Sequence, residues 1–477
     1  MTGDGRLFID MEKFPIYNVT KQLHKTLNMT RRDSMKFSIM REKITPDIPV
    51  KQAGYAARDH KSIGVHDDTY ASVALMEANE TVVIIALDVC YGDKRFTYGI
   101  KETINKKYGL TQDKIIISYT HTHSAVGITG EEIATPDFED TSKPGNDESK
   151  ENPGHGEAIR YYHIVKDKIM AMLEEEFKNL IEGDVYICRG RSKFGVSRRY
   201  PSAEGILWRP YYGEDSMDDD LLLLKFVDRN KKIHGLIYNY ACHPTTLGSD
   251  NYYISADYPG VVRKLLEEKN KGMTAIFLQG CGADIKPYIT AGDAKFKNCT
   301  YEELEHAGTS LANDIQACIE KSEWRKIDAE FKTGFSEVKL YTEVWDEVKW
   351  MTVLNDPDEP EYRKRAVREK LEHMKTAKAK NYLPYYMSFL RLDDKTCLVC
   401  LECEVVSDIG KEIKRLFNED VIVLGYSNSI ACYIPTKKVL QQGGYERDSF
   451  MSARLAGPFV PEIEDIIVGR AALMVKS

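Results

Sequence analysis

The stretch Ile115–Gly127, IIISYTHTHSAVG, indicates both the fold class and the place where its chemistry lies. Its three consecutive isoleucines predict a buried β-strand, because β-branched residues favour strands. The run ends at His121 and His123, and α/β proteins place their ligands outside the carboxyl ends of strands. Neutral imidazole is the commonest protein ligand for zinc. The stretch therefore predicts a metal site, and a solvated polar strand end is the alternative.

Three further segments repeat this arrangement, in which an apolar run is followed by polar side chains. Histidine, carboxylate and a phenol, each near a strand end, form the pattern of a zinc site assembled from distant parts of a chain. The segments and their polar residues are His243 in KIHGLIYNYACHPTT (Lys232–Thr246), Glu402 and Glu404 in CLVCLECEVVS (Cys397–Ser407), and Tyr426 and Tyr433 in VIVLGYSNSIACYIPT (Val421–Thr436).

With these motifs in place, the chain resembles the catalytic domain of the neutral/alkaline non-lysosomal ceramidases, from about Met35 to about Pro461. The order and approximate spacing of the shared motifs also resemble those of the family. The motifs are GYAARDHKSIGVHDDTYASVAL (Gly54–Leu75), VVIIALDVC (Val82–Cys90), THTHSAVG (Thr120–Gly127), NYACHPTTLGSDNYYISADYPG (Asn239–Gly260), FLQGCGADIKP (Phe277–Pro287), GYSNSIACYIPT (Gly425–Thr436), QQGGYE (Gln441–Glu446) and AGPF (Ala456–Phe459).

The resemblance implies a set of zinc ligands, carried over position by position. His121 is preferred to His123 because the family's ligand is the first histidine of its His-Thr-His motif. Glu404 is preferred to Glu402 by its position before the expected helix Val406–Phe417. Residues two apart in a strand share a face, and only the later glutamate would reach the strand end; Glu402 stays an alternative. The implied ligands are His121, His243, Glu404 and Tyr433.

The resemblance also implies catalytic side chains around the metal. His123 matches the histidine that lies beside the scissile carbonyl in the family. Tyr445 matches an active-site tyrosine, and Arg198 in VSRRYP approximately matches an arginine. His123 and Tyr445, together with the zinc ion, would stabilise the oxyanion that forms when water attacks a carbonyl group.

One position departs from the family. Its loop carries a serine immediately before proline, whereas this chain has Lys286 in GADIKP. Lysine is a cation on a flexible stem and cannot replace a serine nucleophile. Lys286 is either a catalytic residue, in which case its charge favours an anionic group on the substrate, or a surface lysine that only flanks the site.

Composition limits the classes of partner. The net charge of −8 and a pI near 5.9 argue against nucleic acid and anionic membranes, and no apolar run approaches the length of a membrane span. We expect a small-molecule substrate and no stable membrane insertion. The expected organisation is an N-terminal extension at residues 1–34 followed by one catalytic domain at 35–477. The Ig-like module that follows this domain in the family is expected to be absent.

The N-terminal sequence MTGDGRLFIDMEKFP lacks the basic and apolar regions of a secretion signal. The ten cysteines lie mostly inside apolar runs, as reduced thiols do. We therefore expect a cytoplasmic location. The triplet Cys397, Cys400 and Cys403 has the spacing of a cluster motif but falls in a strand, where residues three apart face opposite sides, so buried thiols are the preferred interpretation.

The remaining pattern predicts an α/β fold in which a mixed sheet is flanked by helices and the metal site lies at strand ends. Segment Glu131–Gly156 is expected to be an irregular insertion. The expected strands are Val82–Val89, Ile115–Tyr119, Leu221–Val227, Leu236–Tyr240, Ala275–Leu278, Phe389–Leu392, Cys397–Leu401 and Val421–Leu424. The expected helices are Arg95–Tyr108, Ile159–Leu180, Pro259–Glu268, Tyr301–Lys321, Glu361–Thr376 and Val406–Phe417.

Two hypotheses about function follow from these observations. The first is a zinc-dependent hydrolase of a non-peptide amide bond, acting on a smaller or more polar molecule than ceramide. An ester or lactone hydrolase is its nearest rival, because the same attack serves any carbonyl group. The second hypothesis is a metal-binding scaffold without activity.

Overall fold

A large, curved, mixed sheet forms one half of the protein in the computed structural model, which describes residues 35–130, 153–203, 205–375, 380–417, 420–453 and 455–476. Eight of its nine strands run in spatial order and β16 (Arg325–Lys326) pairs with β8. The ordered strands are β14 (Thr274–Gln279), β12 (Ile233–Tyr240), β11 (Asp220–Asp228), β8 (Ile181–Arg191), β1 (Lys36–Lys43), β3 (Tyr70–Glu77), β4 (Thr81–Leu87) and β6 (Ile115–Tyr119).

A second, four-stranded sheet packs against the inner face of the first. Its strands, in order, are β17 (Lys332–Tyr341), β18 (Tyr382–Asp393), β19 (Thr396–Leu401) and β21 (Asp420–Leu424). Side chains from both sheets meet in one buried core, which includes Phe37, Ile84 and Ile237 from the first sheet and Leu398 and Ile422 from the second. Burial of this apolar surface holds the two sheets face to face.

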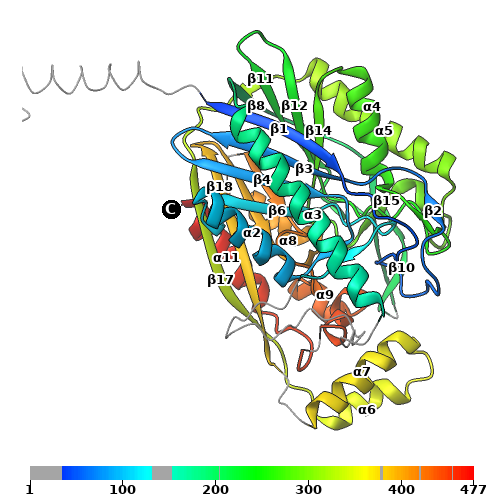
Figure 1. Cartoon of the computed structure of the whole chain (residues 1–477). Helices are drawn as coiled ribbons and strands as arrows, with labels where there is room; N and C mark the ends of the chain where they lie inside the picture. Colours follow the sequence, from blue (N-terminus) through cyan, green and yellow to red (C-terminus); the bar gives the residue numbers. More distant parts are fainter. Residues whose placement is uncertain are drawn as a thin grey trace, which may run out of the picture.

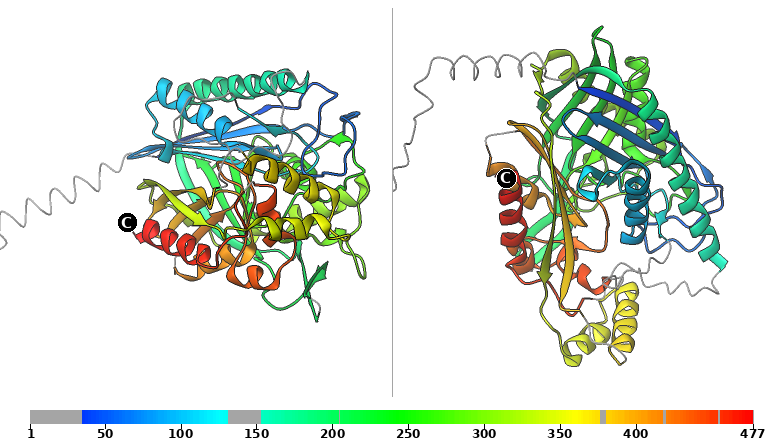
Figure 2. Two further views of the ribbon diagram at one scale, coloured as in Figure 1. Left: turned by 90° about the horizontal axis from the view of Figure 1, so that it is seen from below. Right: turned by 60° about the vertical axis from the view of Figure 1, so that its left-hand side comes forward.

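Helices cover the outer faces of both sheets, so the chain forms four layers, helix, sheet, sheet and helix (Figures 1 and 2). Two pairs of helices cover the large sheet, and two further helices cover the small one. The helices on the large sheet are α2 (Lys94–Tyr108), α3 (Pro153–Lys178), α4 (Asp257–Lys269) and α5 (Tyr301–Lys321), and those on the small sheet are α8 (Ser407–Arg415) and α11 (Ile463–Lys476).

The structure confirms the predicted α/β class and divides the expected strands between the two sheets. The expected helices also form, with ends that differ by a few residues. Of the expected insertion Glu131–Gly156, residues 131–152 lie outside the described part. Its last four residues belong to α3, so the prediction is wrong there; helix α3 begins at Pro153, which the first turn of a helix tolerates.

The short elements lie around one end of the two sheets or beyond it. The helices α6 (Glu347–Asn355) and α7 (Glu361–Met374) form a projecting pair (Figure 1). The remaining elements are β2 (Gly64–Val65) with β13 (Tyr253–Ile254), β5 (Tyr91–Gly92) with β7 (Gly127–Ile128), β9 (Gly195–Ser202) with β10 (Gly205–Tyr211) and β15 (Ile285–Pro287), β20 (Glu404–Val405) with β22 (Tyr433–Ile434), α9 (Lys437–Gln442) and α10 (Tyr445–Asp448).

Parallel pairing brings the important strand ends together. Strands β4 and β6, β12 and β14, and β19 and β21 pair in parallel, so each pair ends on one edge of its sheet. Isolated bridges join Ser118 to Ser427 and Gly280 to Leu424, linking the ends of β6 and β14 to the end of β21. The carboxyl ends of both sheets therefore meet in one place.

Candidate metal centre

His121 leaves the end of β6 in a left-handed backbone conformation, with φ at 65°. Its Nδ1 lies 2.6 Å from the carbonyl oxygen of Cys90. Because a carbonyl oxygen only accepts hydrogen bonds, Nδ1 must carry the proton, which leaves a lone pair on Nε2. This arrangement is the one found in metal-binding histidines, whose second nitrogen is held by an outer acceptor.

His243, which follows β12, is held in the same way. Its Nδ1 lies 2.6 Å from the carbonyl oxygen of Gly282 in the loop after β14. A Cβ atom at Gly282 would lie 2.6 Å from the backbone nitrogen of Cys242, so only glycine allows the loop to approach this closely. The histidine is fully buried, and its Nε2 faces the same space as that of His121.

Glu404 completes a group of three possible ligands. Its Oε2 lies 3.0 Å from Nε2 of His243 and 3.3 Å from Nε2 of His121. The ligand atoms of the three residues all lie within 4.8 Å of one another, and all three side chains are buried. Two imidazoles and a carboxylate that face one another directly match the donor set of a catalytic zinc site.

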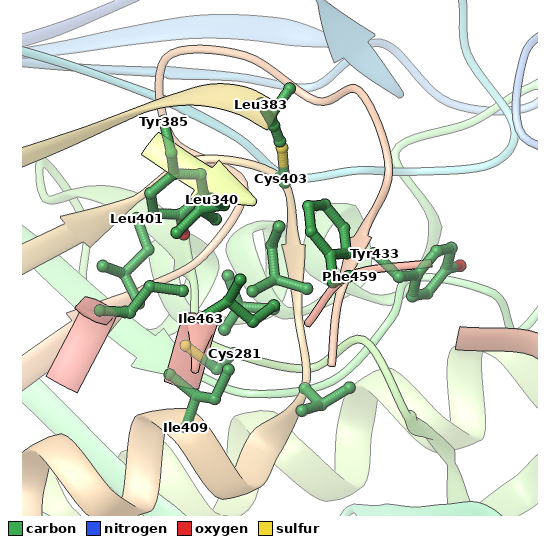
Figure 3. Close-up of a cluster of buried hydrophobic side chains, with 14 of the residues drawn as sticks. Cys281, Leu340, Leu383, Tyr385, Leu401, Cys403, Ile409, Tyr433, Phe459 and Ile463 are labelled. Carbon is green, nitrogen blue, oxygen red and sulfur yellow. The ribbon is translucent and has the colours of Figure 1, made fainter. Parts of the chain in front are cut away.

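Tyr433 lies beside this group. Strands β20 and β22 pair in parallel with Glu404 opposite Tyr433, and the Tyr433 ring stacks 6.4 Å from that of His243. Figure 3 shows Tyr433 at the edge of the core under the small sheet, with its hydroxyl directed away from the core. Tyr426 instead places its hydroxyl 3.4 Å from Nδ1 of His243, on the side away from the lone pair.

Glu402 serves a different purpose from Glu404. Its oxygens accept hydrogen bonds from the Tyr386 backbone and the Ser429 hydroxyl and form an ion pair of 3.3 Å with Lys94. The expectation that both glutamates share a strand face is wrong, because β19 ends at Leu401 and Cys403 adopts a φ of 67° between them. The described structure thus places Glu404, and not Glu402, among the histidines.

The pKa values of the three grouped residues show that the site favours a positive charge. Burial opposes the charged form of His121, but the Glu404 carboxylate outweighs it and raises the pKa of His121 to about 10. Burial lowers the pKa of His243 to about 4, while the two histidines hold the pKa of Glu404 well below its usual range despite burial. A proton on His121 supplies the positive charge that a metal ion would supply instead.

His123 lies next to the group, with its Nε2 3.1 Å from Nε2 of His121. Burial, reinforced by the other two histidines, lowers its pKa well below 6.5, so it is neutral at physiological pH. Its Nδ1 has no hydrogen-bond partner in the described part of the chain. A neutral imidazole here can donate one hydrogen bond to a group bound beside the metal.

A loop from residues 53–58, which sequence reasoning left without a role, fixes the position of His123. Gly54 has a φ of 89°, and a Cβ atom there would lie 2.6 Å from Nδ1 of His123. Tyr55 packs its ring edge against the imidazole, and Arg58 donates a hydrogen bond of 2.6 Å to the His123 carbonyl oxygen. The glycine in the GYAARD motif was the one available signal.

Arg198 on β9 is buried beside Tyr433. Its guanidinium carbon lies 5.4 Å from the Tyr433 ring, 5.5 Å from Tyr445 and 4.2 Å from Trp208. Nε donates a hydrogen bond of 2.8 Å to Glu446. Nη2 is buried and has no partner among the described residues.

Tyr445 contributes the most open wall of the site. Its ring contacts that of Tyr433 at 5.3 Å, and 37% of the residue is exposed. Burial raises the pKa of the Tyr445 hydroxyl to about 12, so the hydroxyl keeps its proton and stays a hydrogen-bond donor at neutral pH. Tyr445 and Arg198 therefore both lie beside Tyr433, and their catalytic role stays a prediction.

Lys286 on β15 is buried, so the expectation of a surface lysine is wrong. Only 9% of the residue is exposed, and Nζ donates a hydrogen bond of 3.0 Å to Oγ1 of Thr245. Desolvation, reinforced by Arg198, lowers the pKa of Lys286 to about 8. The carbonyl oxygen of the neighbouring residue, Ile285, accepts a hydrogen bond from the backbone nitrogen of His243.

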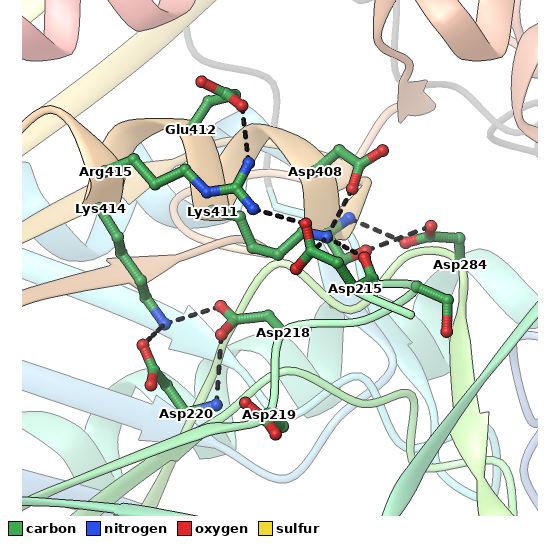
Figure 4. Close-up of polar contacts among 12 residues, drawn as sticks. Asp215, Asp218, Asp219, Asp220, Asp284, Asp408, Lys411, Glu412, Lys414 and Arg415 are labelled. Carbon is green, nitrogen blue, oxygen red and sulfur yellow. Dashed lines mark hydrogen bonds and ion pairs between the residues drawn. The ribbon is translucent and has the colours of Figure 1, made fainter. Parts of the chain in front are cut away.

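Two buried aspartates hold the loops of the site. Asp257 accepts hydrogen bonds from the backbone nitrogens of Thr246, Leu247 and Tyr258, and so fixes the chain after His243. Asp284 accepts one from the Ser407 nitrogen at the start of α8, where no side chain of the helix caps its own end. Figure 4 shows this contact beside the ion pairs of Lys411 and Lys414 that bind α8 to the loop before β11.

The predicted cysteine triplet contributes buried thiols. Cys397 and Cys403 lie in the core beneath α8 and α11, whereas Cys400 lies in the core between the sheets. Cys397 and Cys400, both in β19, thus lie on opposite faces of the small sheet, as strand alternation predicts. In the described part of the chain, no helix is both long enough and apolar enough to cross a membrane.

The fold and the site together define a mixed α/β protein with a buried histidine–carboxylate cluster that fits a metal ion. The family described as "Neutral/alkaline non-lysosomal ceramidase, N-terminal" matches residues 43–317, which is more than half of the sequence. The chain belongs to this family.

Similar proteins agree with this assignment. The neutral ceramidase of Oryza sativa subsp. japonica is 24% identical over 230 residues, covering 47% of this chain and 27% of that protein. Neutral ceramidase 2 of Arabidopsis thaliana is 26% identical over 235 residues, covering 47% and 28%. The match thus spans little more than a quarter of the length of either plant protein.

Solved structures show the same fold. The neutral ceramidase from Pseudomonas aeruginosa superimposes with a TM-score of 0.68 at 17% identity, covering 93% of this chain and 74% of that one. A structure described as ceramidase complexed with C2 gives a TM-score of 0.67 at 16% identity, covering 93% and 75%. The shared fold confirms the architecture predicted from the strand-end motifs.

Proposed function

We propose that this protein is a zinc-dependent hydrolase that cleaves a non-peptide N-acyl amide bond. The observation that carries the proposal is the convergence of His121, His243 and Glu404 on one buried point, with His123 alongside. Membership of a family whose matched relatives are named neutral ceramidases supports an amide as the substrate.

The residues fit a zinc ion on their chemistry. Both histidines have Nδ1 held by a backbone carbonyl, so that both Nε2 lone pairs remain for an ion. Glu404 would be the third ligand and Tyr433 the fourth. A zinc ion bound there supplies Lewis acidity, which polarises a carbonyl group and lowers the pKa of water toward neutrality.

The chain's own residues then orient and stabilise the reacting groups. In hydrolysis, the oxygen of water adds to the carbonyl carbon, the C–N bond breaks, and the amine leaves with a proton. His123 and Tyr445 each carry a donor that would hydrogen-bond to the carbonyl oxygen as it gains negative charge. Arg198 contributes a fixed positive charge beside Tyr433.

The substrate that we propose is smaller or more polar than ceramide. Lys286 occupies the position where the family resemblance expects a serine, and its cation is buried next to the loop of His243. Long-chain ceramide, which is uncharged, is therefore expected to be a poor substrate. A cytoplasmic location and the division into residues 1–34 and 35–477 stay predictions from the sequence.

The test is turnover of N-acyl amides and matched esters by the purified protein, before and after treatment with a chelator. Amide hydrolysis that is lost on chelation and restored by Zn²⁺ is the expected result. Turnover of esters or lactones alone would favour the rival hydrolase. Zinc bound at full occupancy without any turnover would favour the scaffold instead.

A further inference from the structure

Lys286 is a buried cation that has no acidic partner. Nζ contacts the hydroxyl and carbonyl oxygens of Thr245, at 3.0 and 3.4 Å, and lies 5.5 Å from the centre of the Phe296 ring, but it forms no ion pair within the described residues. Lysine is seldom buried unless it is paired, because removing an ammonium from water is costly. Among the described residues, the fold thus keeps a positive charge at this position without a carboxylate in direct contact with Nζ.

The acids nearby are already occupied. Asp257 acts on Lys286 electrostatically, but its oxygens accept three backbone N–H groups. Glu446 lies between two arginines, with Oε1 bonded to Arg198 and Oε2 bonded to Arg199. Three cations therefore share one carboxylate, since Glu404 belongs to the candidate metal site.

Lys286 and Arg198 lie on the same face of a β-ribbon. In the antiparallel pair of β9 and β15, Lys286 is opposite Val196, and Arg198 follows Val196 by two residues. Residues two apart in a strand share a face, and diagonal neighbours are within reach of long side chains. Nη2 of Arg198 has no hydrogen-bond partner in the described structure, and Nζ of Lys286 is bonded to oxygens of Thr245 alone, so neither of these two cationic donors contacts a carboxylate.

This face adjoins the candidate metal site. The charge of Lys286 acts electrostatically on His123. In the strand of Lys286, the carbonyl oxygen of Ile285 accepts a hydrogen bond from the backbone nitrogen of His243. Thr245, which contacts Nζ, lies two residues after His243. A molecule whose amide carbonyl lies at the metal can therefore place an attached group at Lys286.

We propose that Lys286 and the free Nη2 of Arg198 bind a carboxylate carried by the substrate, which makes N-acyl amino acids the preferred class over neutral N-acyl amines. This inference rests on the proposed amide hydrolysis. Each oxygen of the carboxylate would accept a hydrogen bond from one of the two cations, and the substrate would supply the direct carboxylate contact that Nζ of Lys286 lacks among the described residues.

The test compares two probes, N-dodecanoylglycine and neutral N-dodecanoylethanolamine, on the zinc-loaded protein and on Lys286→Met. The variant keeps an unbranched side chain, one heavy atom shorter, and removes its charge. We expect KM for the glycine probe to rise about 10- to 100-fold, the usual weight of a charged hydrogen bond, and KM for the ethanolamine probe to stay unchanged. Lys295→Met, which removes an exposed lysine nearby in the sequence, should change neither value.

Equal KM values for both probes in the native protein, or an equal effect of Lys286→Met on both, would overturn the inference and leave amide hydrolysis standing. If neither probe is hydrolysed, calorimetric binding of the two probes separates the proposals. Preferential binding of the glycine probe that Lys286→Met abolishes supports the anion site without the hydrolase; equal binding overturns the anion site. Lys286→Gln replaces Lys286→Met if thermal melting shows that the latter does not fold.

Discussion

Glu404 and Tyr433 face each other across the two short parallel strands β20 and β22. Side chains at paired positions of neighbouring strands lie on one face of the sheet, so the phenol of Tyr433 and the carboxylate of Glu404 point to the same side. The backbone nitrogen of Glu404 also donates to the carbonyl oxygen of Cys432, the residue before Tyr433. A change that moves one of the two residues will therefore move the other.

Replacing Glu404 with glutamine should abolish zinc binding, because the site would lose its only carboxylate ligand among the described residues. Glu402→Gln is the matched control, since its side chain bonds to Lys94, Tyr386 and Ser429. We expect it to retain one zinc per chain. Metal content measured on purified variants decides the matter, and the opposite pattern would make Glu402 the ligand.

The two histidines of the THTH motif should have different roles. His121→Ala is expected to lose both metal and activity, whereas His123→Ala keeps zinc and lowers kcat by about 10²–10³, the usual effect of losing one donor to an oxyanion. Metal content and kcat for an N-acyl amide measure both effects. Unchanged zinc content in both variants would remove this histidine pair from the metal site.

Gly54→Ala should reduce activity without removing zinc. The added methyl group would overlap the imidazole of His123, and a displacement of about 1 Å in a catalytic group can cost about 10² in rate. Gly109→Ala is a matched control, because Gly109 also has a positive φ, 72°, but has open space where its Cβ would lie. That variant should lose about 1 kcal/mol of stability and keep its kcat. A Gly54→Ala protein with native kcat would show that the loop does not position His123.

Lys286→Met should change how the free energy of unfolding depends on pH. Burial lowers the pKa of Lys286 from 10.5 to about 8, so between these values the unfolded chain binds more protons and the stability of the native protein rises with pH. Below pH 8 the full cost of the buried charge, about 3 kcal/mol, is present. The variant lacks this cost, so its stability advantage should shrink from pH 8 to 10.5.

Denaturant unfolding of the zinc-loaded proteins at several pH values provides the measurement. Among the neighbours of Lys286, burial raises the pKa of Cys242 well above its usual range and that of Cys299 to about 11, and it lowers the pKa of His123 well below its usual range. Parallel stability curves would show that Lys286 keeps its ordinary pKa.

The sequence predicted strands β6 and β19 because they are covered on both faces, whereas β1 and β3, which follow β8 in the middle of the large sheet, were not predicted. All residues of β6 and β19 are buried, and their uninterrupted apolar runs are easily recognised. Strands β8 and β17 were missed, since polar and partly exposed residues interrupt both. Their pairing is decided by neighbouring strands, and no periodicity in either segment reveals it.

The candidate site was predictable only where a motif ends a strand. The histidines and Glu404 met that condition, although the left-handed turn at Cys403 that separates Glu402 from Glu404 was not visible in the sequence. The contact of Gly54 with His123 and the burial of Lys286 depend on segments far apart in the chain. Such contacts arise from tertiary packing, which local patterns do not encode.

The four proposed ligands come from both sheets, and this division has a consequence for how the protein is made. His121 and His243 follow strands of the large sheet, whereas Glu404 and Tyr433 follow strands of the small one. A growing chain on the ribosome presents the two histidines long before Glu404 is synthesised. Because metal affinity requires the assembled ligand set, the proposed ion can be captured stably only after Tyr433 has emerged and the two sheets have joined. Metal loading would then follow the joining of the two sheets, and a chain truncated before Glu404 would not sequester zinc.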